Sequence, residues 1–178
     1  MSTSPLSLQS VYHGWDGFQA SLVRAIDPLS PEQLAWRQRP EDRSVGEIAA
    51  HIAFGRVDWF QRMGAPRSAD LAQRIAAVDQ AAVATDAAAI VAWLADTWQM
   101  VEETLTQWTV EDLAVTYPHP YRGTLYAVSR QWTIWRILSH DIYHGGQLTV
   151  LLGAQGIEPF ELAALGGHLT EPAVIGPA

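Results

Sequence analysis

Residues 138–148 of this 178-residue chain read Leu-Ser-His-Asp-Ile-Tyr-His-Gly-Gly-Gln-Leu, which places His140 and His144 four positions apart. In an α-helix, residues four apart lie one turn above each other on one face, so both imidazoles can reach a single ion. Apolar residues recur at helical spacing through residues 129–152, and Gly153 follows as a stop signal. The pattern predicts two metal ligands on one long helix.

Three other segments have the same amphipathic spacing and are predicted to be long helices: residues 6–26, 45–63 and 86–108. The second begins with a capping box, in which Ser44 and Glu47 satisfy each other's free backbone N–H groups. Asp86 is a suitable N-cap for the third. Shorter helices are expected over residues 31–36 and 69–78, and a single turn over 109–113.

The connection before the last helix is predicted to be irregular. Residues 117–123 contain Pro118, Pro120 and Gly123, which argue against a regular element, although residues 113–117 could be extended. No strand alternation of useful length and no internal repeat are evident elsewhere. The predicted fold class is therefore all-α, a four-helix bundle with short extra helices in the connections.

The composition fits one domain over residues 1–178, with a core of about 6–153 and a tail of 154–178. Hydrophobic residues make up 48% of the chain and charged residues 17%, enough for a substantial core. Most of the eight tryptophans should pack in it, leaving one or two for a pocket or a subunit contact, such as that of a homodimer.

Charge and targeting signals limit the partners. Eleven Lys and Arg stand against nineteen Asp and Glu, a net charge of −8, which argues against a nucleic-acid partner or an anionic membrane surface. The first residues lack a signal-peptide pattern, and the apolar run over residues 87–94 is too short to span a bilayer. We expect a cytoplasmic protein that acts on a small-molecule substrate. The absence of cysteine excludes thiolate ligands and a protein thiol nucleophile.

A third ligand can come from the helix over residues 45–63. His51 lies in its middle among apolar residues, where an unpaired imidazole would be costly to bury. Alone it would more often be a hydrogen-bonded core histidine, but the pair on the last helix favours a ligand. Gly145 and Gly146 each cost about 1 kcal/mol in a helix relative to alanine. Close approach of another backbone at the metal end, or packing between helices, would explain them.

Several motifs resemble the DinB-like superfamily, which also includes YfiT-like and mycothiol- or bacillithiol-dependent enzymes. The resemblance covers the chain from the first helix to about Pro159. It is carried by LSPEQL at residues 29–34, RP at 39–40, SVGEIAAH at 44–51, HDIYHGGQ at 140–147, LG at 152–153 and GIEP at 156–159. It implies a metal-binding four-helix bundle with His51, His140 and His144 as ligands. The family often has arginine at the position of Gly145, a departure that concerns the rim of the site.

Three neutral histidines leave at least one coordination position open, as in catalytic zinc sites. Imidazole also suits nickel, iron and copper; the resemblance favours zinc or nickel. A coordinated water, or a low-molecular-weight thiol supplied as a cofactor, could attack a small electrophile there. The sequence thus predicts a hydrolase or a thiol S-transferase, and a non-catalytic metal or small-molecule binding bundle remains the alternative.

Six residues are candidate helpers at this site: Asp141, Tyr143, Gln147, Tyr12, His13 and Arg136. Asp141 should point about 100° away from the metal face, as a carboxylate supporting the site or at the surface. His119 in the proline loop and His168 in the glycine-rich tail are expected to be solvated.

Two other metal chemistries fit less well. The run from His140 to His144 looks like a zincin motif with aspartate in place of the catalytic glutamate, but aspartate reaches less far and the third ligand would have to lie downstream. A di-iron carboxylate bundle requires Glu-x-x-His motifs, and no histidine here has glutamate three residues before it.

Overall fold

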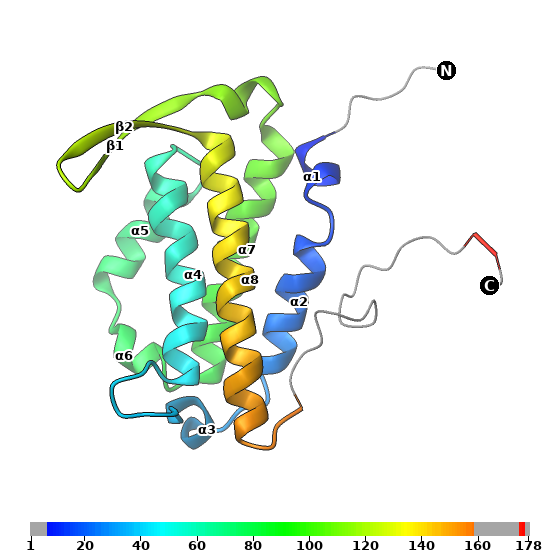
Figure 1. The fold of residues 1–178 in the computed structure, drawn as a ribbon, viewed down its shortest axis with the longest axis vertical. Helices are drawn as coiled ribbons and strands as arrows, with labels where there is room; N and C mark the ends of the chain where they lie inside the picture. The colour runs from blue at the N-terminus through cyan, green and yellow to red at the C-terminus, as the bar shows by residue number, and fades with distance from the viewer. Residues whose placement is uncertain (1–6, 159–174, 177–178) are drawn as a thin grey trace.

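Four long helices form the body of the molecule in the computed structural model, which describes residues 7–158 and 175–176. They are α2 (Trp15–Ile26), α4 (Val45–Arg62), α7 (Ala87–Gln107) and α8 (Arg130–Ala154) (Figure 1). Helix α4 packs against both α7 and α8, and α2 packs against α7. The prediction of an all-α bundle is confirmed.

The predicted capping residues begin these helices. Ser44 accepts a hydrogen bond from the backbone N–H of Glu47, and the Glu47 carboxylate accepts one from the Ser44 N–H, at 3.2 and 2.6 Å. Ser30 forms the same box at the start of α3 (Pro31–Ala35). Asp86 caps α7 and Ser129 caps α8, so α3, α4, α7 and α8 each start where a side chain satisfies free N–H groups, whereas α2 follows Gly14 without a side-chain cap.

The first predicted helix is interrupted. In place of one element over residues 6–26, the chain forms α1 (Leu8–Val11) and then α2, separated by Gly14 in a left-handed conformation with φ of 102°. Glycine adopts this conformation without a steric penalty, which is why the break falls there. The remaining short helices are α5 (Ser68–Ala77), α6 (Gln80–Val83) and the 3-10 turn η1 (Glu111–Ala114).

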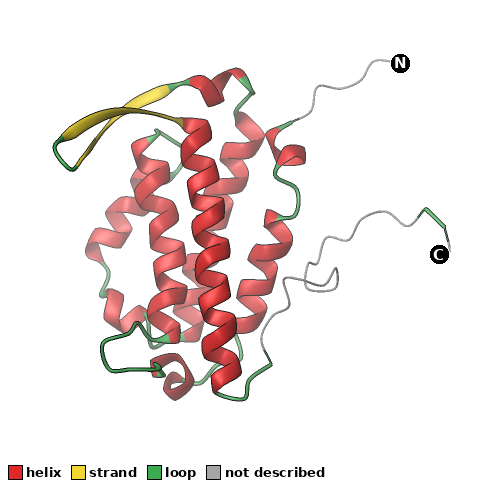
Figure 2. Cartoon of the chain, in the orientation of Figure 1, coloured by secondary structure: helices red, strands yellow, loops and turns green. Residues whose placement is uncertain are grey.

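The prediction of an irregular segment at residues 117–123 is wrong. β1 (Thr116–Tyr121) and β2 (Thr124–Ser129) form an antiparallel hairpin that extends from the start of α8 (Figure 2). Arg122 and Gly123 make the two-residue turn with φ of 49° and 78°, the positive values that such tight hairpin turns require.

The two prolines of β1 are compatible with the hairpin because of the register. Tyr121 pairs with Thr124 next to the turn, so Pro120 and Pro118 fall on the alternate, non-hydrogen-bonded positions opposite Leu125 and Ala127. Their missing N–H groups would have pointed away from β2. Proline is tolerated at such outward-facing positions of an edge strand.

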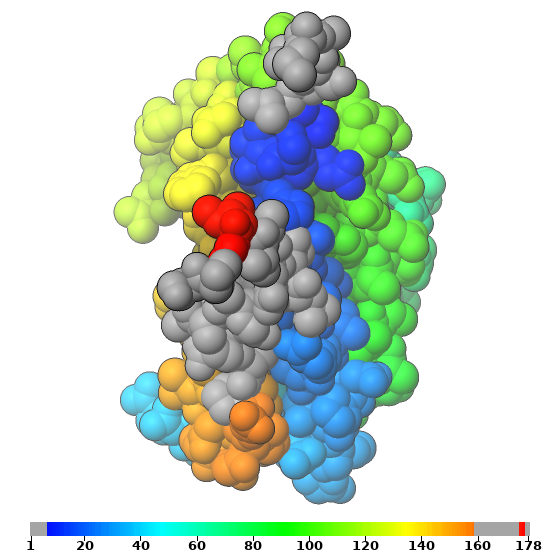
Figure 3. Space-filling view, turned by 90° about the vertical axis from the view of Figure 1, so that its right-hand side faces the viewer, coloured from blue at the N-terminus to red at the C-terminus, as the bar shows by residue number. Residues whose placement is uncertain are grey.

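The core lies between the four long helices and contains fully buried side chains from each, including Leu22, Ile52, Leu94 and Ile134. On one face, α1 and α2 lie between α7 and α8 (Figure 3). Of the eight tryptophans, Trp15 and Trp93 are buried, and Trp132 and Trp135 on α8 are 44% and 60% exposed. The other four are partly buried and pack against the core: Trp36, Trp59, Trp98 and Trp108. No helix among the described residues has the length and apolar character needed to cross a membrane.

Candidate metal centre

Helices α4 and α8 bring three histidines together. His51 lies in the first half of α4, and His140 and His144 lie one turn apart on α8. One ring nitrogen from each lies within 4.8 Å of the others. Within the described residues this is the one group of three or more histidine and acidic side chains that could hold a metal ion.

The nitrogen positions suit a small divalent ion. His140 Nε2 lies 3.1 Å from His51 Nε2, and the His144 ring is 4.8 Å from the His51 ring and 4.4 Å from the His140 ring, centroid to centroid. Two imidazole nitrogens on a tetrahedral zinc ion, each about 2.0–2.1 Å from the metal, are about 3.3 Å apart. The His51 and His140 nitrogens are therefore spaced almost as they would be on such an ion, and the three donor atoms all lie within 4.8 Å of one another.

Gln147 sets the tautomer of His144. The Gln147 Oε1 lies 2.7 Å from His144 Nδ1, and the Gln147 amide donates to the Tyr143 hydroxyl at 3.3 Å. Because a carbonyl oxygen only accepts, Nδ1 carries the hydrogen and Nε2 keeps a lone pair for a metal. Of the predicted helpers, Gln147 and Tyr143 are therefore placed at the cluster.

Asp141 supports His140 from the interior. Its side chain is fully buried, and its Oδ1 lies 3.6 Å from His140 Nδ1. Neither of these two atoms has a hydrogen-bond partner within the described residues. The expectation of a supporting carboxylate agrees with this position, and the surface alternative does not.

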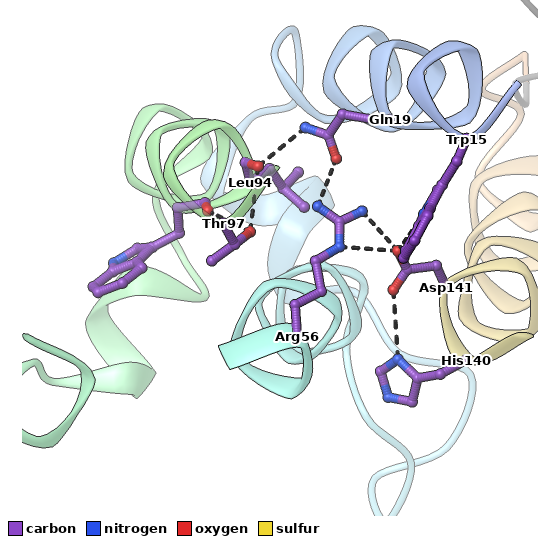
Figure 4. A network of polar contacts seen from close by, with 8 residues as sticks. Trp15, Gln19, Arg56, Leu94, Thr97, His140 and Asp141 are labelled. Atoms are coloured by element: carbon purple, nitrogen blue, oxygen red, sulfur yellow. Dashed lines mark hydrogen bonds and ion pairs between the residues drawn. The ribbon is translucent and has the colours of Figure 1, made fainter. Parts of the chain in front are cut away.

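The other oxygen of Asp141 belongs to a buried polar network that joins the four long helices (Figure 4). Asp141 Oδ2 accepts from Trp15 Nε1 at 3.0 Å and from Arg56 Nε at 2.9 Å, and Arg56 Nη2 lies 2.8 Å away. Arg56 Nη1 donates to Gln19, whose amide donates to the Leu94 carbonyl. The network fixes the carboxylate beside the metal centre.

Sequence inspection missed Arg56, although a signal was present. Ile52, Arg56 and Phe60 recur every four residues on α4 and all three are fully buried. On α8, Asp141 lies four residues after the buried Ile137. An arginine in one apolar stripe and an aspartate in another indicate a buried pair, because a lone charge there would be too costly.

Two of the three imidazoles, those of His51 and His144, are held in the neutral form that binds metals. Burial lowers the pKa of His51 to about 4, with further contributions from Arg43 and from the other two histidines. Burial also lowers the pKa of His144, although its hydrogen bond to Gln147 acts in the opposite direction. Two of the three donors therefore do not have to lose a proton before they bind a metal near neutral pH.

Two cavities open on either side of the cluster. One, of about 460 Å³, is lined by His51, Phe54 and the loop before α4. The other, of about 630 Å³, is lined by His144, Gln147 and the same loop. Arg43 lines both and has no acidic partner among residues 7–158 and 175–176. A small molecule can reach the histidines from solvent through these two cavities.

Glycine is required on α4 opposite His140. A Cβ at Gly55 would lie 2.9 Å from His140 Cε1, so a larger residue would displace the ring. By contrast, a Cβ at Gly146 would meet nothing within 4 Å. The predicted close backbone approach is therefore wrong for Gly146, which borders the 630 Å³ cavity.

The remaining candidate residues lie elsewhere. His13 and Tyr12 precede α2 and line cavities away from the three histidines. Arg136 and His119 border a pocket below the hairpin; His119 is only partly exposed and lies 3.3 Å from Arg62. His168 falls outside the described residues.

Comparison with known proteins places the chain in a family. The model of the DinB superfamily matches residues 15–148, and the chain belongs to this superfamily. A crystal structure of a DinB-like protein from Bacillus cereus ATCC 10987 has the same fold, with a TM-score of 0.69 over 88% of this chain and 97% of that chain, at 19% sequence identity. No curated protein gives a significant match.

Proposed function

We propose that His51, His140 and His144 bind one divalent transition metal and that the protein is a metal-dependent enzyme acting on a small electrophile. The observation that carries the metal site is the convergence of three ring nitrogens within 4.8 Å. Zinc and nickel suit three neutral imidazoles, and cavities on both sides leave room for substrate.

A bound metal would lower the pKa of a coordinated water, or of a thiol supplied as a cofactor, and so provide a nucleophile at neutral pH. The chain has no cysteine for this role. Its own groups orient the donors: Gln147 holds the hydrogen on His144 Nδ1, and Asp141 faces Nδ1 of His140. Both arrangements leave the Nε2 atoms of His140 and His144 free to bind a metal.

Arg43 supports a reaction with an anionic nucleophile or substrate. Its charge contributes to lowering the pKa of both His51 and His144, so its field reaches the cluster from the rim of both cavities. The same field would stabilise negative charge that develops next to the metal.

Elemental analysis of protein purified without an affinity tag tests the metal site. We expect about one metal ion per chain, and loss of the ion in His51→Ala, His140→Ala and His144→Ala. His13→Ala is the matched control, because His13 is exposed and lies outside the cluster. Full metal content in His51→Ala would exclude the three-histidine site.

The enzymatic proposal has a separate test. Cobalt-substituted protein should change its visible spectrum when a low-molecular-weight thiol is added, and a panel of thiols with epoxides or halogenated arenes should give transfer products. Hydrolysis of activated esters or amides tests the water branch. Stoichiometric metal with no spectral change and no turnover in either assay would leave the non-catalytic binding role.

A further inference from the structure

A pocket of about 560 Å³ lies below the hairpin, where β1 and β2 extend over the ends of α4 and α8 (Figure 1). We call it the hairpin pocket. Its volume is in the range of sites for small molecules. Its main side chains are Trp59, His119, Tyr121, Tyr126, Trp132 and Arg136.

The walls of the hairpin pocket are aromatic and partly open to solvent. The rings of Trp59 and Trp132 lie 5.6 Å apart at an angle of 55°, and His119 packs 5.1 Å from Trp59. Trp132 is 44% exposed and Tyr126 48% exposed. Exposed aromatic faces grouped around a cavity favour a planar ligand, because a stacked ring would bury apolar surface that the aromatic side chains now expose to water.

One cation in the pocket has no counter-ion in the part of the chain that the structure describes. The Arg136 guanidinium lies 4.6 Å from the Trp59 ring centroid and 5.5 Å from that of Trp132. It makes no ion pair with any acidic group among residues 7–158 and 175–176, whereas nearby Arg62 is paired with Asp58 at 2.9 Å. A guanidinium that lies over aromatic rings and has no carboxylate partner keeps its donors available for the two oxygens of an acidic group.

The pocket is aligned with the metal centre. Arg136, His140 and His144 are spaced four apart on α8, so Arg136 is one turn, or about 6 Å, from the nearest histidine of the cluster. On α4, Gly55 lies midway between His51 and Trp59, and its lack of a side chain leaves the space that the His140 ring occupies. A ligand seated against Trp59 and Trp132 therefore lies on the side of His140 that faces the hairpin.

We infer that the hairpin pocket binds a small aromatic acid, with its ring among Trp59, Trp132 and Tyr126 and its acidic group on Arg136. In a chain with a net charge of −8, this free arginine marks a local site for an anion. The claim that the bound acid is the substrate rests on the proposed function. The claim that the pocket binds such an acid is independent of it.

Calorimetric titration of metal-free protein with 2-naphthoate tests the inference at fixed ionic strength. We expect saturable binding, weakened at least about tenfold by Arg136→Gln and also weakened by Trp132→Leu. The neutral analogue 2-naphthylmethanol should bind at least about tenfold more weakly than 2-naphthoate to the unmodified protein. Its affinity should be the same in Arg136→Gln.

The matched control is Arg122→Gln, at the tip of the same hairpin. Like Arg136, Arg122 lies over an aromatic ring, that of Tyr121, but it does not line the pocket. Its loss should therefore leave the affinity for 2-naphthoate unchanged. The inference would be overturned if Arg122→Gln weakened binding as much as Arg136→Gln does, or if 2-naphthoate and 2-naphthylmethanol bound with equal affinity. Absence of saturable binding would also overturn it. A concentration-dependent dimer that Trp132→Leu disrupts would also overturn it, because a second copy would then cover the pocket.

The same titration on His51→Ala separates this inference from the proposed function. Binding of 2-naphthoate should be unchanged there, since the pocket contains no histidine of the cluster. Loss of metal from the triad variants with unchanged naphthoate binding would support both claims. If the triad variants keep their metal, only the proposed function fails.

Discussion

The carboxylate of Asp141 faces His140 on one side and Arg56 on the other: Oδ1 lies 3.6 Å from His140 Nδ1, and Oδ2 accepts from Arg56 Nε at 2.9 Å. One side chain thus joins the buried charge network to the metal centre. A carboxylate next to Nδ1 favours the tautomer that leaves Nε2 free to bind a metal.

Breaking the buried pair should destabilise the protein strongly. We expect Asp141→Asn or Arg56→Met to lower the free energy of unfolding by about 3–5 kcal/mol, because each leaves a buried group unpaired. The double variant Arg56→Met with Asp141→Leu should cost less than either single change. Urea unfolding followed by circular dichroism measures all three. Additive costs in the double variant would show that the two residues do not interact.

Replacing Gly55 with alanine should weaken metal binding more than it affects stability. The added Cβ would lie 2.9 Å from His140 Cε1 and would push the ring away from His51. Gly146→Ala is the matched control, because its Cβ has free space; it should keep the metal and stabilise α8 by about 0.5–1 kcal/mol. Metal titrations and thermal unfolding compare the two. Equal affinities in both variants would contradict the prediction.

Loss of the Gln147 side-chain amide should reduce metal affinity. In Gln147→Leu, His144 Nδ1 loses the acceptor that fixes its tautomer, and such supporting groups contribute about 10–100-fold in metal affinity. Gln131→Leu is the control, on the same helix but in its exposed first turn. Competition with a chromophoric chelator gives both constants. A Gln147→Leu affinity within twofold of the control would argue against this role.

The metal-free protein should lose stability as the pH falls from 6.5 toward 4. In the unfolded chain His51 takes up a proton at its ordinary pKa of 6.5, whereas burial keeps it neutral in the folded protein down to about pH 4. The unfolded state therefore binds more protons across this window, and the free energy of unfolding rises with pH.

His51→Ala isolates this contribution from carboxylates that titrate in the same range. Urea midpoints measured at intervals from pH 7 to pH 4 should depend less steeply on pH in the variant than in the unmodified protein. Parallel curves would show that His51 is protonated equally in both states.

The helices and the clustering of the three histidines were predictable because their signals are local. The capping boxes at Ser30 and Ser44 and the four-residue spacing of His140 and His144 each depend on neighbours within one turn. His51 required the further step that a lone imidazole among apolar residues needs a partner.

The errors arose where distant or alternating contacts decide the structure. Pro118 and Pro120 exclude helix but only restrict strand pairing, and the register that accommodates them depends on the turn at Arg122 and Gly123. The apolar stripes around Arg56 and Asp141 indicate that both charges are buried, but the two residues lie 85 positions apart, so no local pattern specifies that they pair with each other.

The buried Arg56–Asp141 contact ties α4 to α8 beside the histidines, which makes the donor positions a property of the folded chain and not of the ion. In small zinc domains the metal organises the protein; here the two long helices that carry the three histidines position them. Such a site can lose and regain its ion without refolding. In the proposed site, three imidazoles would accept several divalent ions, so the supply of metals in the cell would decide which ion is bound.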